Sequence, residues 1–217
     1  MLGNILILGD SYSTHKDWIP DGYDTYYSNE GVDDPRFTVK KMNAEDTWWM
    51  RLINSTGSNL VLNNSWSGSP LCYTGWNLVD CSKTSSFIYR YRQLKEKGFF
   101  EKNKIDTLFV FGGTNDSWCN APIGELKYSD FSEDELFSVL PAICYFMKTL
   151  KEDLLTTRIV FIANCDIKDE LVNGIKIAGE HFGVETIALS GICKEWGHPN
   201  TKGMEEICEQ VLSAIQK

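Results

Sequence analysis

Five short apolar runs, spread along almost the whole chain, constrain the fold of this sequence more than any other feature. Each run is rich in β-branched residues and is continuous rather than alternating, which is typical of strands buried on both faces of a parallel sheet. The runs are NILIL, LVLN, DTLFVFGG, RIVFIAN and VETIAL, at residues 4–8, 60–63, 106–113, 158–164 and 184–189.

Helix-like segments lie between these runs. Residues 45–57 and 167–183 each end in glycine, a common helix stop, and residues 200–216 place apolar side chains at three-and-four spacing. SEDE at 132–135 matches a capping box, and Pro141 is expected to start a second helical piece, because proline breaks a helix interior. Strands that alternate with helices predict a three-layer α/β/α sandwich with about five parallel strands.

The chain of 217 residues is long enough for one hydrophobic core and shows no repeat, linker or low-complexity tract, so we expect a single domain over residues 1–217. A net charge of -9 repels phosphate backbones and argues against nucleic acid as a partner. No apolar run approaches the roughly 20 residues that span a bilayer, so we expect no membrane partner. No basic segment precedes the first run, so a cytoplasmic location is expected; export of a processed precursor stays an alternative, and the oligomeric state stays open.

The seven cysteines are an odd number, and several lie in apolar segments, as expected of buried free thiols. Cys72 and Cys81 lie in a loop-like stretch, where a disulfide is the alternative to free thiols. No CxxC or clustered Cys/His spacing points to a metal site, and we expect neither a metal nor another cofactor.

Small polar residues follow three of the predicted strands. The first strand runs into GDSYS with Ser11, the second into NNSWSGS with Gly68, and the third into GGTNDSW with Asn115. The carboxyl ends of parallel strands meet at one edge of the sheet, so we expect the ligand crevice there, bordered by the long loops 14–44 and 64–84.

Nucleophilic acyl transfer requires a base beside the serine, because a neutral hydroxyl becomes a good nucleophile only when its proton is taken. His198, in EWGHPN before the last helix, supplies that base at the same edge. Gly68 lets a backbone N–H approach a substrate oxygen, and the Asn115 amide adds a donor, which together make a candidate oxyanion hole. Taken singly, each residue has an ordinary interpretation as part of a turn or cap.

The ordered set GDSYS, NNSWSG, GGTND and GHPN resembles the four blocks of the SGNH hydrolases, also called GDSL-like lipases and esterases. The match extends from residue 9 to residue 198 in the family's order. The resemblance implies a flavodoxin-like fold, Ser11 as nucleophile and His198 as general base. It also implies an oxyanion hole made by the backbone N–H groups of Ser11 and Gly68 and the side chain of Asn115.

Two positions depart from the family pattern. GDSYS replaces the commoner GDSL, which changes a neighbour of the nucleophile and not the nucleophile itself. The family usually has Asp three residues before its histidine, and here that position is Glu195, which is longer by one methylene. Two alternatives follow: Glu195 completes a triad, or it faces solvent while a backbone carbonyl orients His198 in a Ser–His dyad.

The other polar candidates have structural interpretations. Asp10 and Asp116 directly follow strands and are placed to bond loop backbone rather than to act as catalytic acids. His15 is expected in a loop that can border the crevice. His181 is expected on the surface of the helix that ends at Gly183.

Trp66 lies inside one of the four blocks and Trp118 and Trp196 lie beside two others, where aromatic faces can hold a sugar or an acyl chain. We therefore expect a serine esterase that acts on a small-molecule or carbohydrate ester, with a small acyl group such as acetyl, through an acyl-enzyme. The alternative is a non-catalytic module, either a flavodoxin-like domain that holds a phosphate on its GDSYST loop or a relative that only binds glycans.

Overall fold

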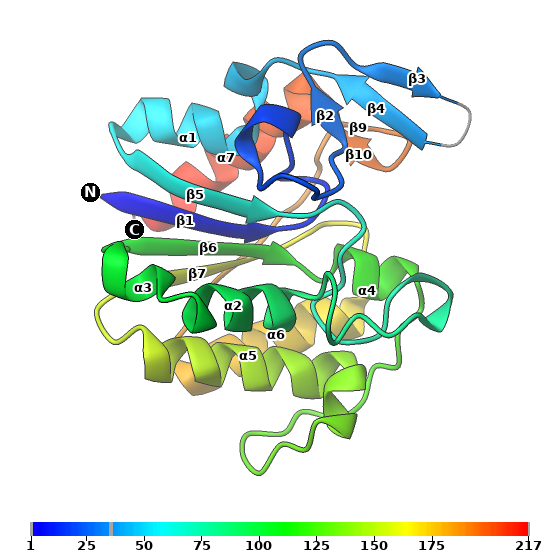
Figure 1. Cartoon of the computed structure of the whole chain (residues 1–217), viewed down its shortest axis with the longest axis vertical. Helices are drawn as coiled ribbons and strands as arrows, with labels where there is room; N and C mark the ends of the chain where they lie inside the picture. The colour runs from blue at the N-terminus through cyan, green and yellow to red at the C-terminus, as the bar shows by residue number, and fades with distance from the viewer. Residues whose placement is uncertain (1, 35–36, 217) are drawn as a thin grey trace.

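A five-stranded parallel sheet forms the centre of the protein in a computed structural model that describes residues 2–34 and 37–216 (Figure 1). The spatial order is β5-β1-β6-β7-β8, and every neighbouring pair is parallel. Counted along this sheet alone, the order is 2-1-3-4-5, which is the flavodoxin-like order. The strands are β1 Asn4–Gly9, β5 Asn59–Ser65, β6 Thr107–Gly112, β7 Arg158–Ala163 and β8 Glu185–Ala188.

These strands fall on the five apolar runs, so the predicted three-layer α/β fold is confirmed. Every residue of β6 is buried, and so is every residue of β7 after Arg158. A central parallel strand meets helices on both faces, and for that reason its sequence is apolar without alternation.

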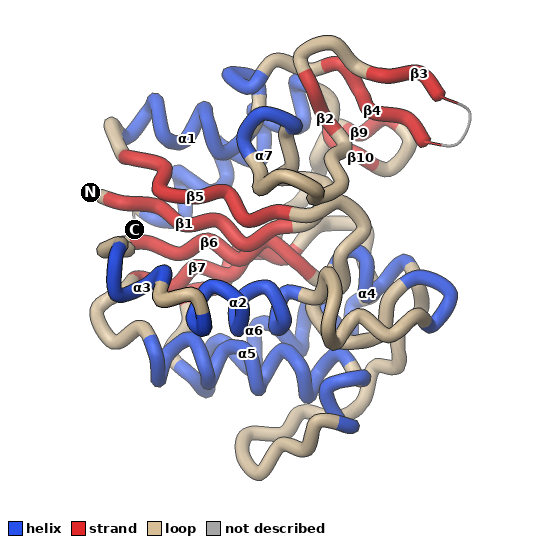
Figure 2. Tube along the Cα trace, viewed as in Figure 1, coloured by secondary structure: helices blue, strands red, loops and turns tan. Residues whose placement is uncertain are grey.

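Helices cover both faces of the sheet, as Figure 2 shows in blue against the red strands. Leu6 and Leu8 of β1 pack into one apolar layer, whereas Ile5 and Ile7 pack into the other, because successive strand residues point to opposite faces. The helices on the Leu6 side are α2 Phe87–Glu96, α3 Phe99–Lys102, α5 Val139–Asp153 and α6 Asp169–Phe182; those on the Ile5 side are α1 Trp48–Thr56 and α7 Thr201–Ile215.

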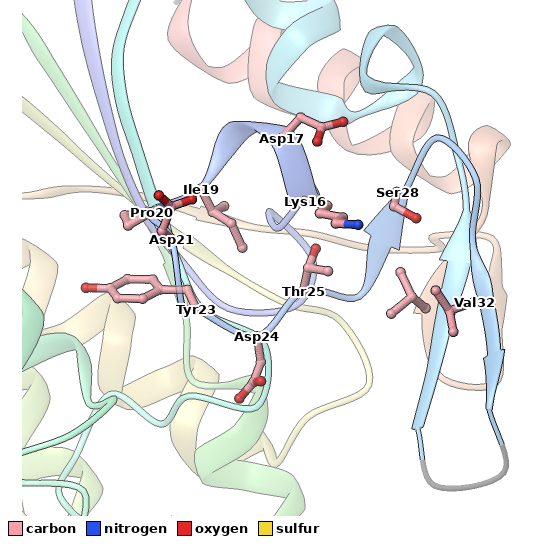
Figure 3. Close-up of a pocket in the computed structure, with 12 residues that line it drawn as sticks. Lys16, Asp17, Ile19, Pro20, Asp21, Tyr23, Asp24, Thr25, Ser28 and Val32 are labelled. Atoms are coloured by element: carbon pink, nitrogen blue, oxygen red, sulfur yellow. The ribbon is translucent and has the colours of Figure 1, made fainter.

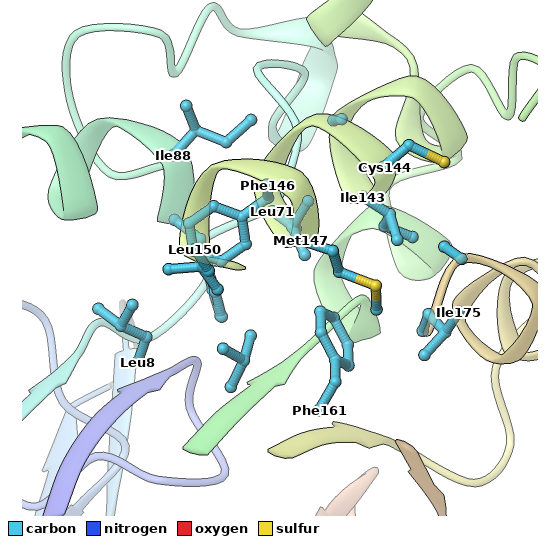
Figure 4. Close-up of a cluster of buried hydrophobic side chains, with 14 of the residues drawn as sticks. Leu8, Leu71, Ile88, Ile143, Cys144, Phe146, Met147, Leu150, Phe161 and Ile175 are labelled. Atoms are coloured by element: carbon cyan, nitrogen blue, oxygen red, sulfur yellow. The ribbon is translucent and has the colours of Figure 1, made fainter. Parts of the chain in front are cut away.

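The larger apolar cluster lies between the sheet and helices α2, α5 and α6 (Figure 4). In it, Phe146 and Met147 of α5 share a fully buried environment with Leu8 and Phe161 of the sheet. Each such side chain contributes about 1.5–3 kcal/mol when it is taken out of water. This packing stabilises the strands whose carboxyl ends carry the polar residues.

The predicted helix ends are close to those observed. Gly57 and Gly183 both adopt left-handed φ values, 63° and 67°, directly after α1 and α6. The predicted capping box forms, since the Ser132 N–H donates to the Glu135 carboxylate over 2.8 Å while the Glu135 N–H donates to Ser132 Oγ over 3.4 Å.

That box precedes a short 3-10 turn, η4 Asp134–Phe137, and the long helix α5 begins afterwards at Val139. The prediction that Pro141 starts this helix is therefore wrong by two residues. Proline is tolerated inside the first turn because its missing N–H would have no partner within the helix there.

The segment after β1 contains structure that the sequence did not indicate. A small three-stranded sheet of order β2-β4-β3 forms between two 3-10 turns, η1 Lys16–Trp18 and η2 Ala44–Asp46. Its strands are β2 Tyr27–Ser28, β3 Val32–Asp34 and β4 Phe37–Lys41. In Figure 1 this small sheet lies beside the hairpin of β9 Lys194–Glu195 and β10 His198–Pro199, beyond the carboxyl ends of the main strands.

All seven cysteines are free thiols, so the Cys72–Cys81 disulfide considered as an alternative is not formed. No helix within the described ranges is both long enough and apolar enough to cross a membrane.

Candidate active site

Ser11 lies in a tight turn that directly follows β1. The Ser13 N–H donates to the Asp10 carbonyl over 3.0 Å, and the Tyr12 N–H donates to Asp10 Oδ1 over 3.0 Å. Gly9 precedes the turn, where a Cβ atom would come within 2.5 Å of Ser65 Oγ. The turn presents Ser11 at the sheet edge with 2% of its surface exposed, and Asp10 has the backbone-bonding role that the sequence suggested.

His198 reaches Ser11 from the β9–β10 hairpin, 187 residues further along the chain. The distance from His198 Nε2 to Ser11 Oγ is 2.9 Å. Trp196 and Gly197 form the two-residue turn, with φ values of 52° and 81°, as a type I′ hairpin turn requires. Trp196 is 87% exposed, so its unusual backbone conformation is set by the turn and not by packing of its side chain.

The imidazole of His198 is enclosed by aromatic rings. Tyr26 stacks on it at a centroid distance of 3.6 Å, and Trp118 meets it edge-on at 5.5 Å. Burial disfavours the charged imidazolium and lowers the pKa of His198 to about 4. The ring is therefore neutral at pH 7 and can accept a proton.

The ring nitrogens of His198 have distinct partners. Nδ1 lies 3.3 Å from the carbonyl oxygen of Trp196, which can only accept a hydrogen bond, so Nδ1 carries the proton in this arrangement. The lone pair of Nε2 then faces Ser11 Oγ. This is the tautomer that a general base beside a serine needs.

Two buried tyrosines fix the backbone on either side of His198. Tyr12 Oη donates to the Gly197 carbonyl, and Tyr27 Oη donates to the Pro199 carbonyl over 2.7 Å. Both phenols come from the segment after β1, which is rich in tyrosine. Sequence reasoning missed them because nothing local shows which carbonyl a distant phenol will meet.

The structure does not bring Glu195 onto His198 Nδ1. Glu195 is exposed, and its Oε1 accepts a hydrogen bond from Asn200 Nδ2 over 3.4 Å. The tight turn directs the Trp196 carbonyl to His198 Nδ1, the nitrogen to which the carboxylate of a triad would bond. Of the two alternatives for Glu195, the observed contacts correspond to the Ser–His dyad.

Asn115 lies in the short helix α4 Thr114–Trp118, which follows β6. Its Oδ1 accepts the indole N–H of Trp76 over 3.1 Å, and its Nδ2 donates to the Ser69 carbonyl over 3.1 Å. An indole N–H can only donate, so this contact fixes which end of the amide is oxygen. One N–H of the amide is used on Ser69, and the second is left for a substrate oxygen.

Trp76 was not predicted as part of the site. It lies in the 3-10 turn η3 Trp76–Leu78, inside the loop that the sequence placed at the crevice. The indole is half-exposed, and its only polar group, the N–H, donates to Asn115 Oδ1.

Gly68 lies between two anchored neighbours. The Ser67 N–H donates to the Asp24 carbonyl over 2.9 Å, and the Ser69 N–H donates to the Trp66 carbonyl over 3.2 Å. Gly68 itself has φ 77°, and no atom lies within 4 Å of where its Cβ would be. Among the described residues, the backbone N–H groups of Ser11 and Gly68 have no acceptor, so both are available to a ligand.

Arg90 of α2 is a buried cation beneath this edge, with 1% of its surface exposed. It donates to the Gly9 carbonyl over 3.1 Å, to Ser69 Oγ over 3.1 Å and to Asn64 Oδ1 over 3.2 Å. Burial lowers its pKa to about 10, which leaves it protonated at pH 7. Arg90 therefore ties the ends of β1 and β5 to the loop that carries Gly68.

The other predicted polar residues lie outside the reacting group. Asp116 is buried and accepts the N–H groups of Leu71 and Cys72 over 2.9 Å each, a structural role. His15 is fully buried, with Nε2 3.1 Å from the Met42 carbonyl, so it does not border the crevice. His181 lies on the surface of α6 and stacks on Tyr128.

No group of three or more His, Cys, Asp and Glu side chains in the described ranges is placed to hold a metal ion. The groups that converge are a hydroxyl, a neutral imidazole and three N–H donors. A parallel α/β/α sheet with this set at its carboxyl edge is the architecture of a serine hydrolase.

Comparison with known proteins narrows this class. The sequence model of the GDSL-like lipase/acylhydrolase family matches residues 3–215, and the chain belongs to this family. A protein from Bacteroides uniformis ATCC 8492, described as a GDSL-like lipase, is 37% identical, with a TM-score of 0.87 over 99% of this chain and 95% of that one. Another from Bacteroides ovatus ATCC 8483 is 33% identical, with a TM-score of 0.88 over 100% and 99%.

More distant solved structures share the fold alone. An acetyl xylan esterase from the rumen bacterium Butyrivibrio proteoclasticus is 19% identical, with a TM-score of 0.61 over 99% of this chain and 63% of that one. No curated protein matches the sequence. The family and its solved members establish a hydrolase of the GDSL-like esterase type.

Proposed function

We propose that the protein hydrolyses small acyl esters, acetyl esters of carbohydrates in particular, through an acyl-enzyme on Ser11. The observation that carries the proposal is the 2.9 Å contact between Ser11 Oγ and His198 Nε2. Beside it lie the backbone N–H groups of Ser11 and Gly68, which have no acceptor among the described residues, and the Asn115 amide, which uses one N–H on Ser69. These groups correspond to the nucleophile, the base and the oxyanion donors of acyl transfer.

In the first half-reaction, Ser11 Oγ attacks the ester carbonyl carbon while His198 Nε2 takes the hydroxyl proton. The carbonyl oxygen becomes an oxyanion, which the N–H groups of Ser11, Gly68 and Asn115 Nδ2 stabilise. Collapse breaks the bond to the alcohol, which leaves with the proton from His198. In the second half-reaction, water attacks the acyl–Ser11 ester with His198 again as base, and the free acid and Ser11 are released.

The imidazolium formed in each step has a backbone carbonyl on Nδ1 instead of a carboxylate. The Trp196 carbonyl fixes the tautomer but carries only a partial negative charge. A dyad of this kind retains the geometry of general base catalysis and stabilises the transient cation less than a triad does.

The confined site supports a small acyl group. Ser11 and Asn115 are both nearly fully buried, and the Ser69 carbonyl accepts a hydrogen bond from Asn115 Nδ2. Exposed aromatic faces at the rim, Trp196 and Trp76, support a carbohydrate as the alcohol part, because flat rings pack against sugar C–H faces.

The non-catalytic alternative has less support. In a phosphate-binding loop several consecutive N–H groups point at the anion. In the GDSYST loop the N–H groups of Tyr12 and Ser13 are already bonded to Asp10.

The decisive test is intact-mass analysis after treatment with a fluorophosphonate, together with hydrolysis of p-nitrophenyl acetate. We expect one added phosphonyl group on the wild type and none on Ser11→Ala, which should also lose esterase activity while keeping its circular dichroism spectrum. Unchanged turnover in Ser11→Ala would refute the proposal.

A further inference from the structure

A cavity of about 670 Å³ lies in the segment that follows β1, and neither Ser11, His198 nor Asn115 lines it. It is a half-open hollow lined by residues of η1, the loop 19–25 and the small sheet β2-β4-β3. Figure 3 shows Tyr23 and Asp24 on one side of it and Ser28 and Val32 on the other, with Lys16 and Ile19 between them. The volume lies within the roughly 300–1,000 Å³ typical of small-molecule sites.

The cavity shares a wall with the candidate active site. Tyr23, which lines it, stacks on Trp66 at a centroid distance of 4.2 Å, and Asp24 Oδ2 accepts the Trp66 indole N–H over 2.9 Å. Three residues beyond Tyr23, Tyr26 stacks on His198. The short segment 23–26 therefore connects the lining of the cavity to the loop of Gly68 and to the base.

The lining indicates the charge of the occupant. The lining includes three aspartates, Asp17, Asp21 and Asp24, and one lysine, Lys16. The excess of negative charge opposes anionic carriers such as phosphates and uronates, in a protein whose net charge is already -9.

The lining also indicates the shape and polarity of the occupant. Apolar surface from Ile19, Pro20 and Val39 alternates with carboxylate and hydroxyl groups, and Tyr23 contributes a ring. Ring faces and aliphatic surface suit the C–H faces of a sugar, while carboxylates accept hydrogen bonds from its hydroxyls. Asp24 already accepts the Trp66 indole N–H and Asp17 accepts Asn29 Nδ2. An apolar acyl chain would desolvate the Asp21 carboxylate without giving it a partner.

We propose that this cavity binds the alcohol part of the ester, an uncharged sugar unit, while the acyl group lies at Ser11. The inference rests on the proposed esterase function and adds a subsite to it. The residues that line the subsite all belong to the segment between β1 and α1. Specificity for the alcohol part is therefore determined by other residues than Ser11 and His198, which react with the ester.

The test compares two substrates that share the reaction and differ in the carrier: p-nitrophenyl acetate and acetylated xylotriose. Ile19→Trp fills the cavity and Asp21→Ala removes an exposed carboxylate from it. Matched controls on α6, beyond the opposite face of the sheet, are Ile177→Trp and Glu180→Ala, both at exposed positions.

We expect Ile19→Trp to raise KM for acetylated xylotriose about tenfold, equivalent to about 1.4 kcal/mol, and Asp21→Ala to raise it about threefold, with kcat/KM for p-nitrophenyl acetate unchanged. The α6 controls should match the wild type with both substrates. Equal losses on both substrates, or an unchanged KM for the sugar ester in Ile19→Trp, would overturn the proposal.

Binding measured without turnover separates this proposal from the esterase proposal. Xylotriose and cellotriose are titrated into Ser11→Ala protein, with tryptophan fluorescence as the readout because Trp66 stacks on Tyr23. We expect saturable binding that Ile19→Trp abolishes. If neither sugar binds, the subsite is refuted even where p-nitrophenyl acetate is hydrolysed; if sugars bind and no ester is cleaved, the esterase function is refuted and the subsite stands.

Discussion

The two halves of the candidate active site are held in different ways. The oxyanion half, around Ser11, Gly68 and Asn115, directly follows strands of the main sheet, and the buried side chains of Arg90 and Asp116 hold its loops by hydrogen bonds. The base half is a two-residue turn outside the sheet, held by phenol hydroxyls on its carbonyls and by ring stacking on His198.

This difference shows where the site depends on charge and where it depends on shape. The donors of the oxyanion half must be aimed at a developing negative charge, and buried ionic groups hold their loops rigidly. The base half needs an uncharged imidazole with one fixed tautomer, which neutral partners and burial provide. The comparison predicts that substitution of an oxyanion donor lowers kcat strongly and that substitution of a residue which orients a donor lowers it less. Substitution of Glu195, the exposed carboxylate near His198, should leave kcat almost unchanged.

Apart from loss of Ser11 or His198 themselves, removal of the amide donor should have the largest effect. Asn115→Ala is expected to lower kcat about 10²- to 10³-fold with little change in KM, because an oxyanion donor acts mainly as charge develops. Steady-state kinetics with p-nitrophenyl acetate measure both constants. An effect confined to KM would mean that Asn115 holds the ground-state substrate instead.

Loss of the group that orients this amide should have a smaller effect. Trp76→Phe keeps the ring and removes the N–H that fixes Asn115 Oδ1, so we expect kcat to fall about tenfold, the scale of one hydrogen bond. Trp18→Phe changes another partly exposed indole and is the control. If Trp76→Phe and Trp18→Phe behave alike, the amide is oriented by other contacts.

Glu195→Gln should change kcat by less than about threefold, because the carboxylate contacts Asn200 and not His198 Nδ1. His198→Ala, measured in the same assay, should abolish activity. Loss of a true triad acid costs on the order of 10²-fold or more, so a fall of that size would place Glu195 on the ring during catalysis.

The smallest expected change is with pH. Burial lowers the pKa of His198 to about 4, so the base stays neutral and competent as the pH falls, and protonation removes it only near pH 4. We expect kcat/KM to vary less than about twofold between pH 7 and pH 5.5. Burial also raises the pKa of Asp10, in the turn that presents Ser11, to about 7. A fall of activity centred near pH 6.5 would mean that an anionic partner offsets the burial of His198, or that protonation of Asp10 disturbs this turn.

The sequence predicted the parts of this molecule that follow from local pattern. Continuous apolar runs marked the five main strands, and the geometry of a parallel sheet brought Ser11, Gly68 and Asn115 to one edge, where the structure places them. The flanking glycines marked the ends of α1 and α6 for the same reason: left-handed φ is a property of the residue itself.

Contacts between distant segments could not be predicted in this way. Nothing around Arg90 in the sequence distinguishes it from the other basic residues of α2, and its burial depends on acceptors that belong to three residues of other segments. Strands as short as Tyr27–Ser28 have too few residues to show a period. The partner of His198 Nδ1 is a carbonyl in its own turn and not Glu195, and residue types do not specify this choice.

The 187 residues that separate Ser11 from His198 have a consequence for the synthesis of the protein. At about 5–20 residues per second, a ribosome makes the serine roughly 10–40 s before the histidine. During that time the nascent chain contains Ser11 but not His198. Tyr12 and Tyr27 likewise lack the carbonyls of Gly197 and Pro199, to which they donate in the folded protein. The chemistry therefore cannot begin during most of translation, although nearly all of the sheet has been made by then.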